Sequence, residues 1–361
     1  MRIFRPKYRL VGLLLIILLA AAVYSANARE KFPFTVKLVL SSAYDDNILK
    51  YSSFDVERFE NSTEPFPSEI TTTDDWINTL GIKVYRDFKL SNRWKLRPYY
   101  YGKVQLYAVN QVKNMTSHFF LLRIGYRNRY FGYFKYSFLP GYYLRIYRDR
   151  DLNEPHGCEF DLSKSAVAVR ADFRLFELEG ELGRELVYYN SHFTEYDSEA
   201  WYWGLAGTFT WITDLQMTAG FSLKISDNIG FDQSTATLPG SATEDTEYGD
   251  GSYQEDQYNL SLVYDLPVES SWNWRVSFTF EQRWRYYQSD LTVANDPFHA
   301  GRRDRRSLVD MAFGFVPYHQ LDVELRFMYD QRRTTSPEPL VTSIKGFDNR
   351  SLEIILTYQV F

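Results

Sequence analysis

Residues 94–108 read WKLRPYYYGKVQLYA, and their apolar and polar side chains alternate along most of the stretch. Successive side chains of an extended strand point to opposite faces. One face would then carry Trp94, Leu96, Tyr100, Val104, Leu106 and Ala108. The other would carry Lys95, Arg97, Tyr99, Tyr101, Lys103, Gln105 and Tyr107. One apolar face and one charged, tyrosine-rich face are typical of a transmembrane β-barrel, whose strands separate lipid from a polar lumen.

The same two-residue period recurs along the chain and predicts about fourteen strands, with twelve or sixteen as the alternatives. The predicted strands are 34–45, 76–90, 94–109, 117–128, 131–147, 160–174, 177–189, 199–212, 215–227, 254–266, 272–287, 304–316, 321–331 and 349–361. Short links follow the even-numbered strands, and longer polar links follow the odd-numbered ones, the longest being 46–75 and 228–253. Short periplasmic turns and long extracellular loops alternate in this way in outer-membrane barrels. We therefore expect an all-β, up-and-down antiparallel barrel without a plug domain.

The tryptophans offer an independent check on this fold. Four of them fall at the loop ends of the predicted strands and four at the turn ends, all on the apolar face: Trp76, Trp201, Trp203 and Trp284, and Trp94, Trp211, Trp272 and Trp274. Aromatic belts of this kind lie at the two membrane interfaces. A soluble β-sandwich also alternates, but it would bury its tryptophans in the middle of its strands.

The N-terminus has the pattern of a secretory signal peptide. Four Lys or Arg residues precede an apolar run from Val11 to Ala22, and Ala26-Asn27-Ala28 fits a cleavage site. We expect residues 1–28 to be removed and residues 29–361 to form the barrel, with an uncleaved anchor as the alternative. Residues 1–28 contain no Asp or Glu, so cleavage makes the chain more acidic than its formal net charge of −5. This balance gives no reason to expect a nucleic-acid partner.

The C-terminal stretch alternates apolar Leu352, Ile354, Leu356, Tyr358 and Val360 with polar residues and reaches Phe361. It resembles the signature by which the barrel-assembly machinery recognises outer-membrane proteins, although Gln359 occupies a position where that signature has an aromatic residue. The resemblance implies the cell outer membrane as the location. Lipid and lipopolysaccharide would then surround the barrel, and the assembly machinery would bind it during biogenesis.

The side chains predicted to face the lumen are unevenly charged. The third to sixth strands carry ten cations and one carboxylate, Asp172, on this face. The cations are Lys95, Arg97, Lys103, Arg123, Arg127, Lys135, Arg145, Lys164, Arg170 and Arg174. The interleaved candidate aromatic residues are Tyr99, Tyr101, Tyr133 and Tyr143, and the acidic candidates on later strands include Glu177, Glu179, Glu181, Asp322 and Glu324.

Two interpretations of this charge pattern compete. The basic sector and its tyrosines could guide anionic or sugar-like solutes through a pore, because Arg binds carboxylates and aromatic rings stack on sugars. Alternatively, the charges neutralise one another, for example through pairs Arg174–Glu177 and Arg170–Glu181 across the hairpin.

The stretch Tyr44-Asp45-Asp46-Asn47 ends the first predicted strand. It resembles a recurring feature of porin-type barrels of Gram-negative bacteria, some of which are linked to exopolysaccharide export. The resemblance implies the barrel architecture and leaves the solute open. In structural terms, Asp and Asn at these positions are also typical of a turn in which side chains bind the nearby backbone.

We found no motif for an enzyme, metal or cofactor. Ser191-His192 with Glu195 and Asp197 is the candidate catalytic cluster, although neighbours in one loop rarely form a triad. We therefore predict no enzymatic activity, no cofactor and no metal. The predicted function is a monomeric, porin-like channel for small or polymeric hydrophilic solutes, with a preference for anionic or saccharide ones. The alternative is a non-conducting barrel that binds a surface ligand or is filled by a partner.

Overall fold

The structure is a computed structural model that describes residues 33–62, 69–149, 151–152, 154–212, 214–231, 248–267 and 272–361. The predicted signal peptide, residues 1–28, lies outside these ranges, as does the middle of the long loop 228–253. Among the described residues, no helix is long and apolar enough to cross a membrane.

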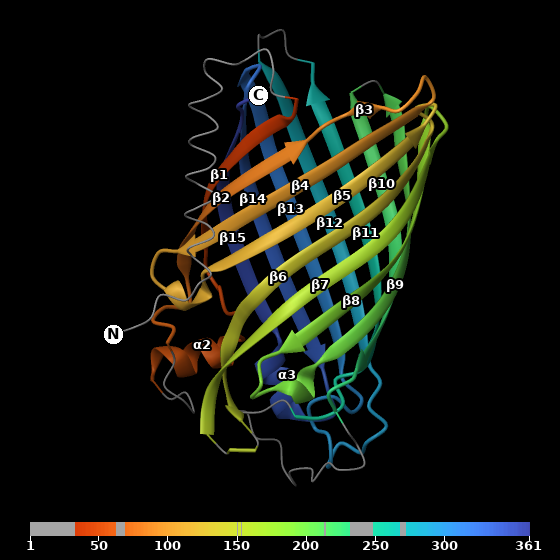
Figure 1. The fold of residues 1–361 in the computed structure, drawn as a ribbon. Helices are drawn as coiled ribbons and strands as arrows, with labels where there is room; N and C mark the ends of the chain where they lie inside the picture. Colours follow the sequence, from red (N-terminus) through yellow and green to blue (C-terminus); the bar gives the residue numbers. More distant parts are fainter. Residues whose placement is uncertain are drawn as a thin grey trace.

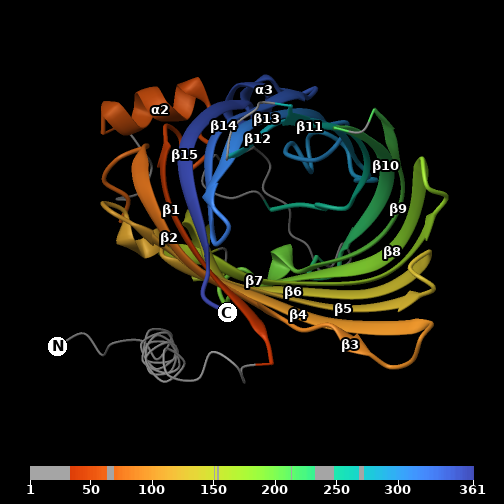
Figure 2. The same ribbon diagram turned by 90° about the horizontal axis from the view of Figure 1, so that it is seen from above.

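The described strands form one closed antiparallel barrel of fourteen strands (Figures 1 and 2). The barrel closes where β1 pairs with β15, and each remaining strand pairs with its neighbours in sequence. The strands are β1 Thr35–Asp45, β2 Asp75–Tyr85, β4 Trp94–Tyr107, β5 Met115–Tyr126, β6 Tyr130–Asp149, β7 Glu154–Asp172, β8 Phe176–Tyr189, β9 Ser198–Ile212, β10 Leu215–Asn228, β11 Tyr253–Leu266, β12 Asn273–Tyr287, β13 Arg303–Tyr318, β14 Leu321–Thr335 and β15 Phe347–Gln359. The short β3, Phe88–Lys89, pairs with β4 on the same edge as β2, beyond the point where β2 ends.

The predicted fold class and strand number are confirmed, and the described residues show no plug domain. Strand boundaries differ most at β7, which begins at Glu154, six residues before the predicted start. The turn between β5 and β6 is tight because Arg127 and Asn128 adopt the left-handed backbone conformation, with φ angles of 55° and 54°. Left-handed residues of this kind match the twist of paired strands.

The outer face of the barrel is apolar, as a lipid-facing surface must be. Trp76, Trp201, Trp203 and Trp284 are exposed near the loop end, and Trp94 and Trp272 near the turn end. Between these belts lie exposed Leu, Ile, Val and Phe side chains such as Phe134, Val169 and Leu205. A closed barrel with this surface satisfies its backbone hydrogen bonds internally and belongs in the outer membrane.

Two arginines that the alternation places on the outer face have simple explanations. Arg86 lies in the break between β2 and β3, where its guanidinium group is 4.6 Å from the ring centre of Phe88. Arg184 pairs with Glu199 on the neighbouring strand, at 2.6 Å, and Glu199 also accepts a hydrogen bond from Trp201. The charge of Arg184 is therefore matched by Glu199 on the outer face.

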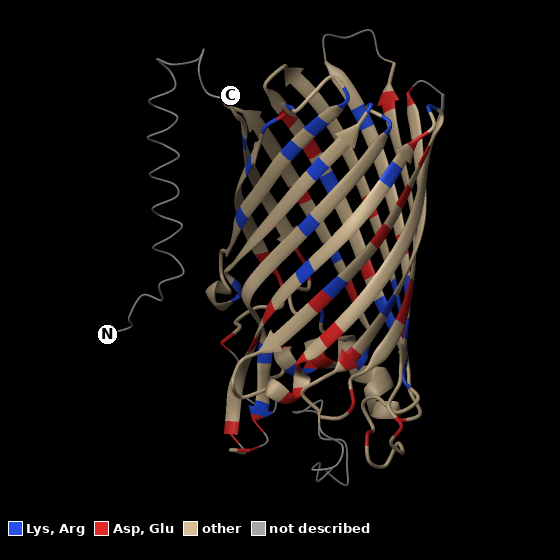
Figure 3. Cartoon of the chain, turned by 45° about the vertical axis from the view of Figure 1, so that its right-hand side comes forward, with Lys and Arg blue, Asp and Glu red and all other residues tan. Residues whose placement is uncertain are grey.

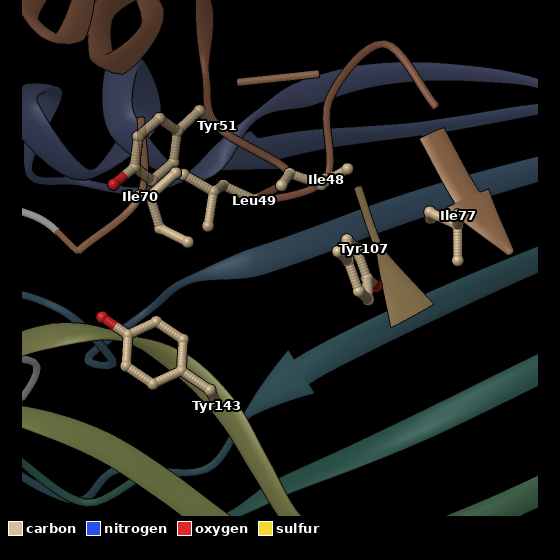
Figure 4. Packing of buried hydrophobic residues seen from close by; sticks show 7 residues of the cluster. All are labelled: Ile48, Leu49, Tyr51, Ile70, Ile77, Tyr107 and Tyr143. Atoms are coloured by element: carbon tan, nitrogen blue, oxygen red, sulfur yellow. The ribbon is translucent and has the colours of Figure 1, made fainter. Parts of the chain in front are cut away.

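The long connections lie at one end of the barrel, opposite the C-terminus (Figure 1). They contain the helices α2, Ser53–Glu60, and α3, Pro339–Lys345, and the single turns η1, Gln111–Lys113, and η2, Thr194–Tyr196. Figure 4 shows the buried cluster beneath the first loop. Its members are Ile48, Leu49, Tyr51, Ile70, Ile77, Tyr107 and Tyr143. The first loop is therefore packed onto the barrel wall.

Candidate functional site

A cavity of about 500 Å³ lies inside the loop end of the barrel. Among the described residues, its lining carries eight Lys or Arg side chains and one carboxylate, that of Glu185. The cations are Lys50, Lys113, Arg145, Arg285, Arg302, Arg306, Arg332 and Lys345. Aromatic rings fill much of the remaining wall: Tyr142, Tyr147, Phe160, Tyr189, Tyr196, Tyr253, Tyr287 and Phe347.

The loops supply a large part of this lining. Ile48, Leu49 and Lys50 come from the first loop, Gly249 and Gly251 from the connection before β11, and His299 and Arg302 from the one before β13. Lys113 lies in η1, Tyr196 in η2 and Lys345 in α3. Because several loops reach the lumen, the loop end of the barrel is narrowed by its own connections.

The stretch Tyr44-Asp45-Asp46-Asn47 holds the first loop in place. Asp45 accepts hydrogen bonds from the Asn47 backbone, at 2.9 Å, and from the Asn349 side chain. Asn47 donates to the Tyr51 and Asp348 carbonyls, at 2.8 and 2.9 Å, and accepts from the Tyr51 N–H. These residues therefore form the expected side-chain-to-backbone turn. They also join the first loop to β15, at the seam where the barrel closes.

The seam turn directs Lys50 to a shared ion pair. Asp330 on β14 is 3% exposed and contacts both Lys50, at 2.7 Å, and Arg306 of β13. Elsewhere in the cavity Arg285 pairs with Glu255, at 2.8 Å, and Glu185 pairs with Lys224, at 2.9 Å. The single carboxylate of Asp330 thus neutralises only part of the charge of Lys50 and Arg306. The described cavity wall therefore keeps an excess of positive charge.

Lys113 and Arg302 are the most deeply buried of the described cavity cations, each at 2% exposure. The Lys113 ammonium donates to the Tyr143 carbonyl, at 2.9 Å, and to the Tyr142 hydroxyl, at 3.3 Å. Burial, together with the neighbouring Arg145, lowers the pKa of Lys113 to about 7. Its charge therefore changes within the physiological pH range.

The basic sector predicted from the sequence lies mostly nearer the turn end, and much of it is ion-paired (Figure 3 shows the charged residues along the strands). Arg97 and Arg123 share Asp87, which lies between β2 and β3. Lys135 contacts both Glu179 and Glu181, and Arg170 pairs with Glu177 at 3.1 Å. The predicted pair Arg170–Glu181 is wrong, because Lys135 reaches Glu181 from β6. Neutralisation of neighbours describes these residues better than an open basic wall does.

The other predicted site residues are distributed as follows. Lys95, Lys103, Tyr99 and Tyr101 lie on the lumen face of β4, Tyr133 on that of β6, and Asp322 and Glu324 on that of β14. Of the basic residues predicted to line the pore, Arg145 lines the cavity.

Two of the predicted positions need correction. Arg127 was expected on the lumen wall, but β5 ends at Tyr126 and Arg127 lies exposed in the turn. Tyr143 was expected to line the pore, but the pairing of β6 with β7 shifts between Leu139 and Tyr142. The shift gives Tyr142 the cavity position and buries Tyr143 in the cluster beneath the first loop.

The candidate catalytic cluster also changes. The carboxylate beside His192 belongs to Asp149, at 2.7 Å, and not to Glu195 or Asp197. Asp197 instead accepts a hydrogen bond from the Tyr189 backbone, at 2.7 Å. The proposed sequence cluster therefore does not assemble as a catalytic group.

Sequence reasoning did not identify the cavity itself. Arg285, Arg306 and Arg332 occupy the loop ends of three adjacent strands, β12, β13 and β14. A comparison of strand-end positions could have grouped these three. Lys50, Lys113 and Lys345 lie in loops, and nothing in their local sequence predicts that they turn into the lumen.

No family model matches the chain, and the search of curated proteins finds no match. Solved structures with a similar fold include a bacterial polysaccharide outer membrane secretin, at 10% identity and a TM-score of 0.38, covering 91% of this chain and 99% of that one. Another is the outer membrane channel DcaP of Acinetobacter baumannii, at 9% identity and a TM-score of 0.43, covering 90% and 96%. An outer membrane channel from Pseudomonas putida F1 has 9% identity and a TM-score of 0.42, covering 91% and 96%.

Proposed function

We propose that this protein is an outer-membrane channel for hydrophilic solutes and that the cavity at its loop end favours anionic, sugar-like ones. The observation that carries the proposal is the cavity lining, with eight cations, one carboxylate and many tyrosines among the described residues. The acidic overall charge of the chain makes this local excess of cations more informative, because it runs against the composition.

The chemistry of the lining suits such a solute. Guanidinium groups bind carboxylates and phosphates with paired hydrogen bonds, and tyrosine rings offer flat faces and hydroxyl groups to a sugar. A narrow lumen with low-dielectric walls also concentrates the field of its charges and raises the local concentration of the opposite ion. A volume of about 500 Å³ is within the range of sites for small molecules.

The proposal is tested by single-channel recording of the purified protein in a planar bilayer under a salt gradient. The reversal potential should show preference for the anion. The variant Arg285→Gln/Arg306→Gln removes two cavity charges. Each lost charge weakens the attraction for a nearby monovalent anion by about 1 kcal/mol in a watery lumen, about fivefold. The double variant should therefore lose much of the anion preference.

A matched control removes two lumen cations outside the cavity. Arg97→Gln/Arg123→Gln changes residues that share Asp87 near the turn end. All four arginines have a carboxylate partner, so the two double variants differ in position and not in pairing. Because Arg97 and Arg123 do not line the cavity, their removal should change selectivity clearly less. Equal effects of the two double variants would contradict the cavity as the selective element. Well-folded protein without conductance steps would favour the alternative, a barrel that binds a ligand at its surface without conducting.

A further inference from the structure

We propose that Asp149, His156 and His192 form a binding site for a divalent transition-metal ion such as Zn²⁺ at the rim of the barrel. Asp149 ends β6, His156 lies near the start of β7, and His192 belongs to the loop between β8 and β9. One ligand-type atom from each residue lies within 4.8 Å of the other two. The three residues span 43 positions of sequence, so no short motif joins them.

The three side chains bring two imidazole nitrogens and a carboxylate close together, and one of these nitrogens has no other partner in the described part of the chain. The imidazole rings of His156 and His192 are stacked, parallel within 8° and with their centres 3.8 Å apart. Because a metal lies in the plane of each imidazole that binds it, one ring must turn when the ion binds. His192 Nδ1 lies 2.7 Å from a carboxylate oxygen of Asp149. His156 Nε2 is buried and has no hydrogen-bond partner among the described residues. A buried ring nitrogen without a partner is costly unless something binds it.

The ligand set indicates the class of ion. Two imidazoles and one carboxylate suit Zn²⁺ and related first-row metals, whereas Mg²⁺ and Ca²⁺ prefer oxygen ligands alone. Ligand atoms around Zn²⁺ at about 2.1 Å would be about 3.4 Å apart, so atoms that now lie up to 4.8 Å apart must approach one another by as much as about 1.4 Å through side-chain rotation. Three protein ligands leave a fourth position for water or another ligand.

The surrounding structure holds the three residues in place. Tyr147, Cys158 and Phe193 form one buried cluster, and each lies within two residues of one proposed ligand. Asn190 ties the His192 loop to β7, since its side chain donates to the Gly157 carbonyl at 2.7 Å. Asp149 Oδ1 accepts the Asp151 and Leu152 N–H groups, which leaves Oδ2 directed at His192. Ligands fixed in this way lose little freedom on binding.

The site adjoins the cavity described above. Tyr147, Tyr189 and Tyr196 of the buried cluster and its surroundings also line that cavity. A bound ion would link the β6–β7 hairpin to the β8–β9 loop and so stabilise one wall of the channel entrance.

The test is isothermal titration of Zn²⁺ into the purified full-length protein in detergent micelles, without a polyhistidine tag. We expect one saturable site. The variants His156→Ala and His192→Ala should each weaken binding by about 100-fold or more. Asp149→Asn keeps an oxygen for the two backbone N–H groups but loses the charge, and should also weaken binding.

His319→Ala provides the control, because this imidazole is exposed in the turn between β13 and β14. It should leave Zn²⁺ binding unchanged. Folding of each variant is checked by its heat-dependent mobility on a gel, and a variant that fails to fold is replaced by His156→Gln or His192→Gln. The proposal is overturned by absence of a saturable site, by native affinity in either histidine variant, or by Mg²⁺ displacing Zn²⁺ at equal concentration.

Discussion

Replacing Asn47 by Ala should release the first loop from the barrel seam. The substitution removes three side-chain hydrogen bonds, two donated to the carbonyls of Tyr51 and Asp348 and one accepted from the Tyr51 N–H. Asn47 is 6% exposed, so water does not replace these bonds while the loop stays docked. At about 1 kcal/mol for each bond, docking should weaken by about 3 kcal/mol.

That loss corresponds to a shift of roughly a hundredfold in the docking equilibrium. Hydrogen exchange measured by mass spectrometry should show it in peptides covering residues 46–62. The amide of Ile48, which now bonds to the Thr73 carbonyl at 2.8 Å, should exchange faster. Because Ile48, Leu49 and Lys50 line the cavity, single-channel conductance should rise as well.

Asp46→Ala is the matched control for this change. Asp46 accepts one hydrogen bond, from the exposed Arg350 N–H, so its removal should alter exchange little. Native exchange rates in the Asn47 variant would refute the role assigned to this side chain. So would an equal acceleration in the Asp46 variant, since that would point to general loosening of the seam.

Three further changes test the charges of the cavity and the outer rim. Because the pKa of Lys113 is lowered to about 7, the cavity should gain positive charge as the pH falls from 8 to 6, and bilayer recordings should show stronger anion preference. Lys113→Met should reduce this change, and an unaltered pH response would contradict the assignment. Asp330→Asn removes the carboxylate that Lys50 and Arg306 share, so the temperature of unfolding on heated gels should fall while anion preference rises. Unchanged selectivity there would place the ion pair off the conduction path. Arg184→Gln breaks a pair on the outer face, and a reversal potential different from the native one would disprove that placement.

Much of the barrel could be predicted because its signals are local. Each strand repeats the two-residue alternation that residues 94–108 display, and each boundary follows a polar link. The weakest strand prediction was the start of β7, where the residues from Cys158 to Ser163 alternate poorly. There the strand extends beyond the barrel wall and packs against the β8–β9 loop, so neighbouring residues decide which side chains are buried.

The candidate site could be predicted only in outline. Alternation identified lumen-facing cations such as Arg97 and Lys135, but not the acidic partners that neutralise them. It also missed the register shift that exchanges Tyr142 and Tyr143, since an extra residue in one strand changes the face of the residues that follow it. A second shift, between Tyr143 and Ile146, limits this change to a short segment. Lys50 and Lys113 reach the cavity through loops whose paths depend on distant contacts.

The strands, their order, the apolar outer face and the polar lumen follow from the amino-acid sequence alone, because period-two alternation and turn residues act over a few positions. The tertiary structure decided which charges are paired and how the loops enter the lumen. It alone brought Asp149, His156 and His192 together, because closing the barrel sets the register that aligns residues from separate hairpins.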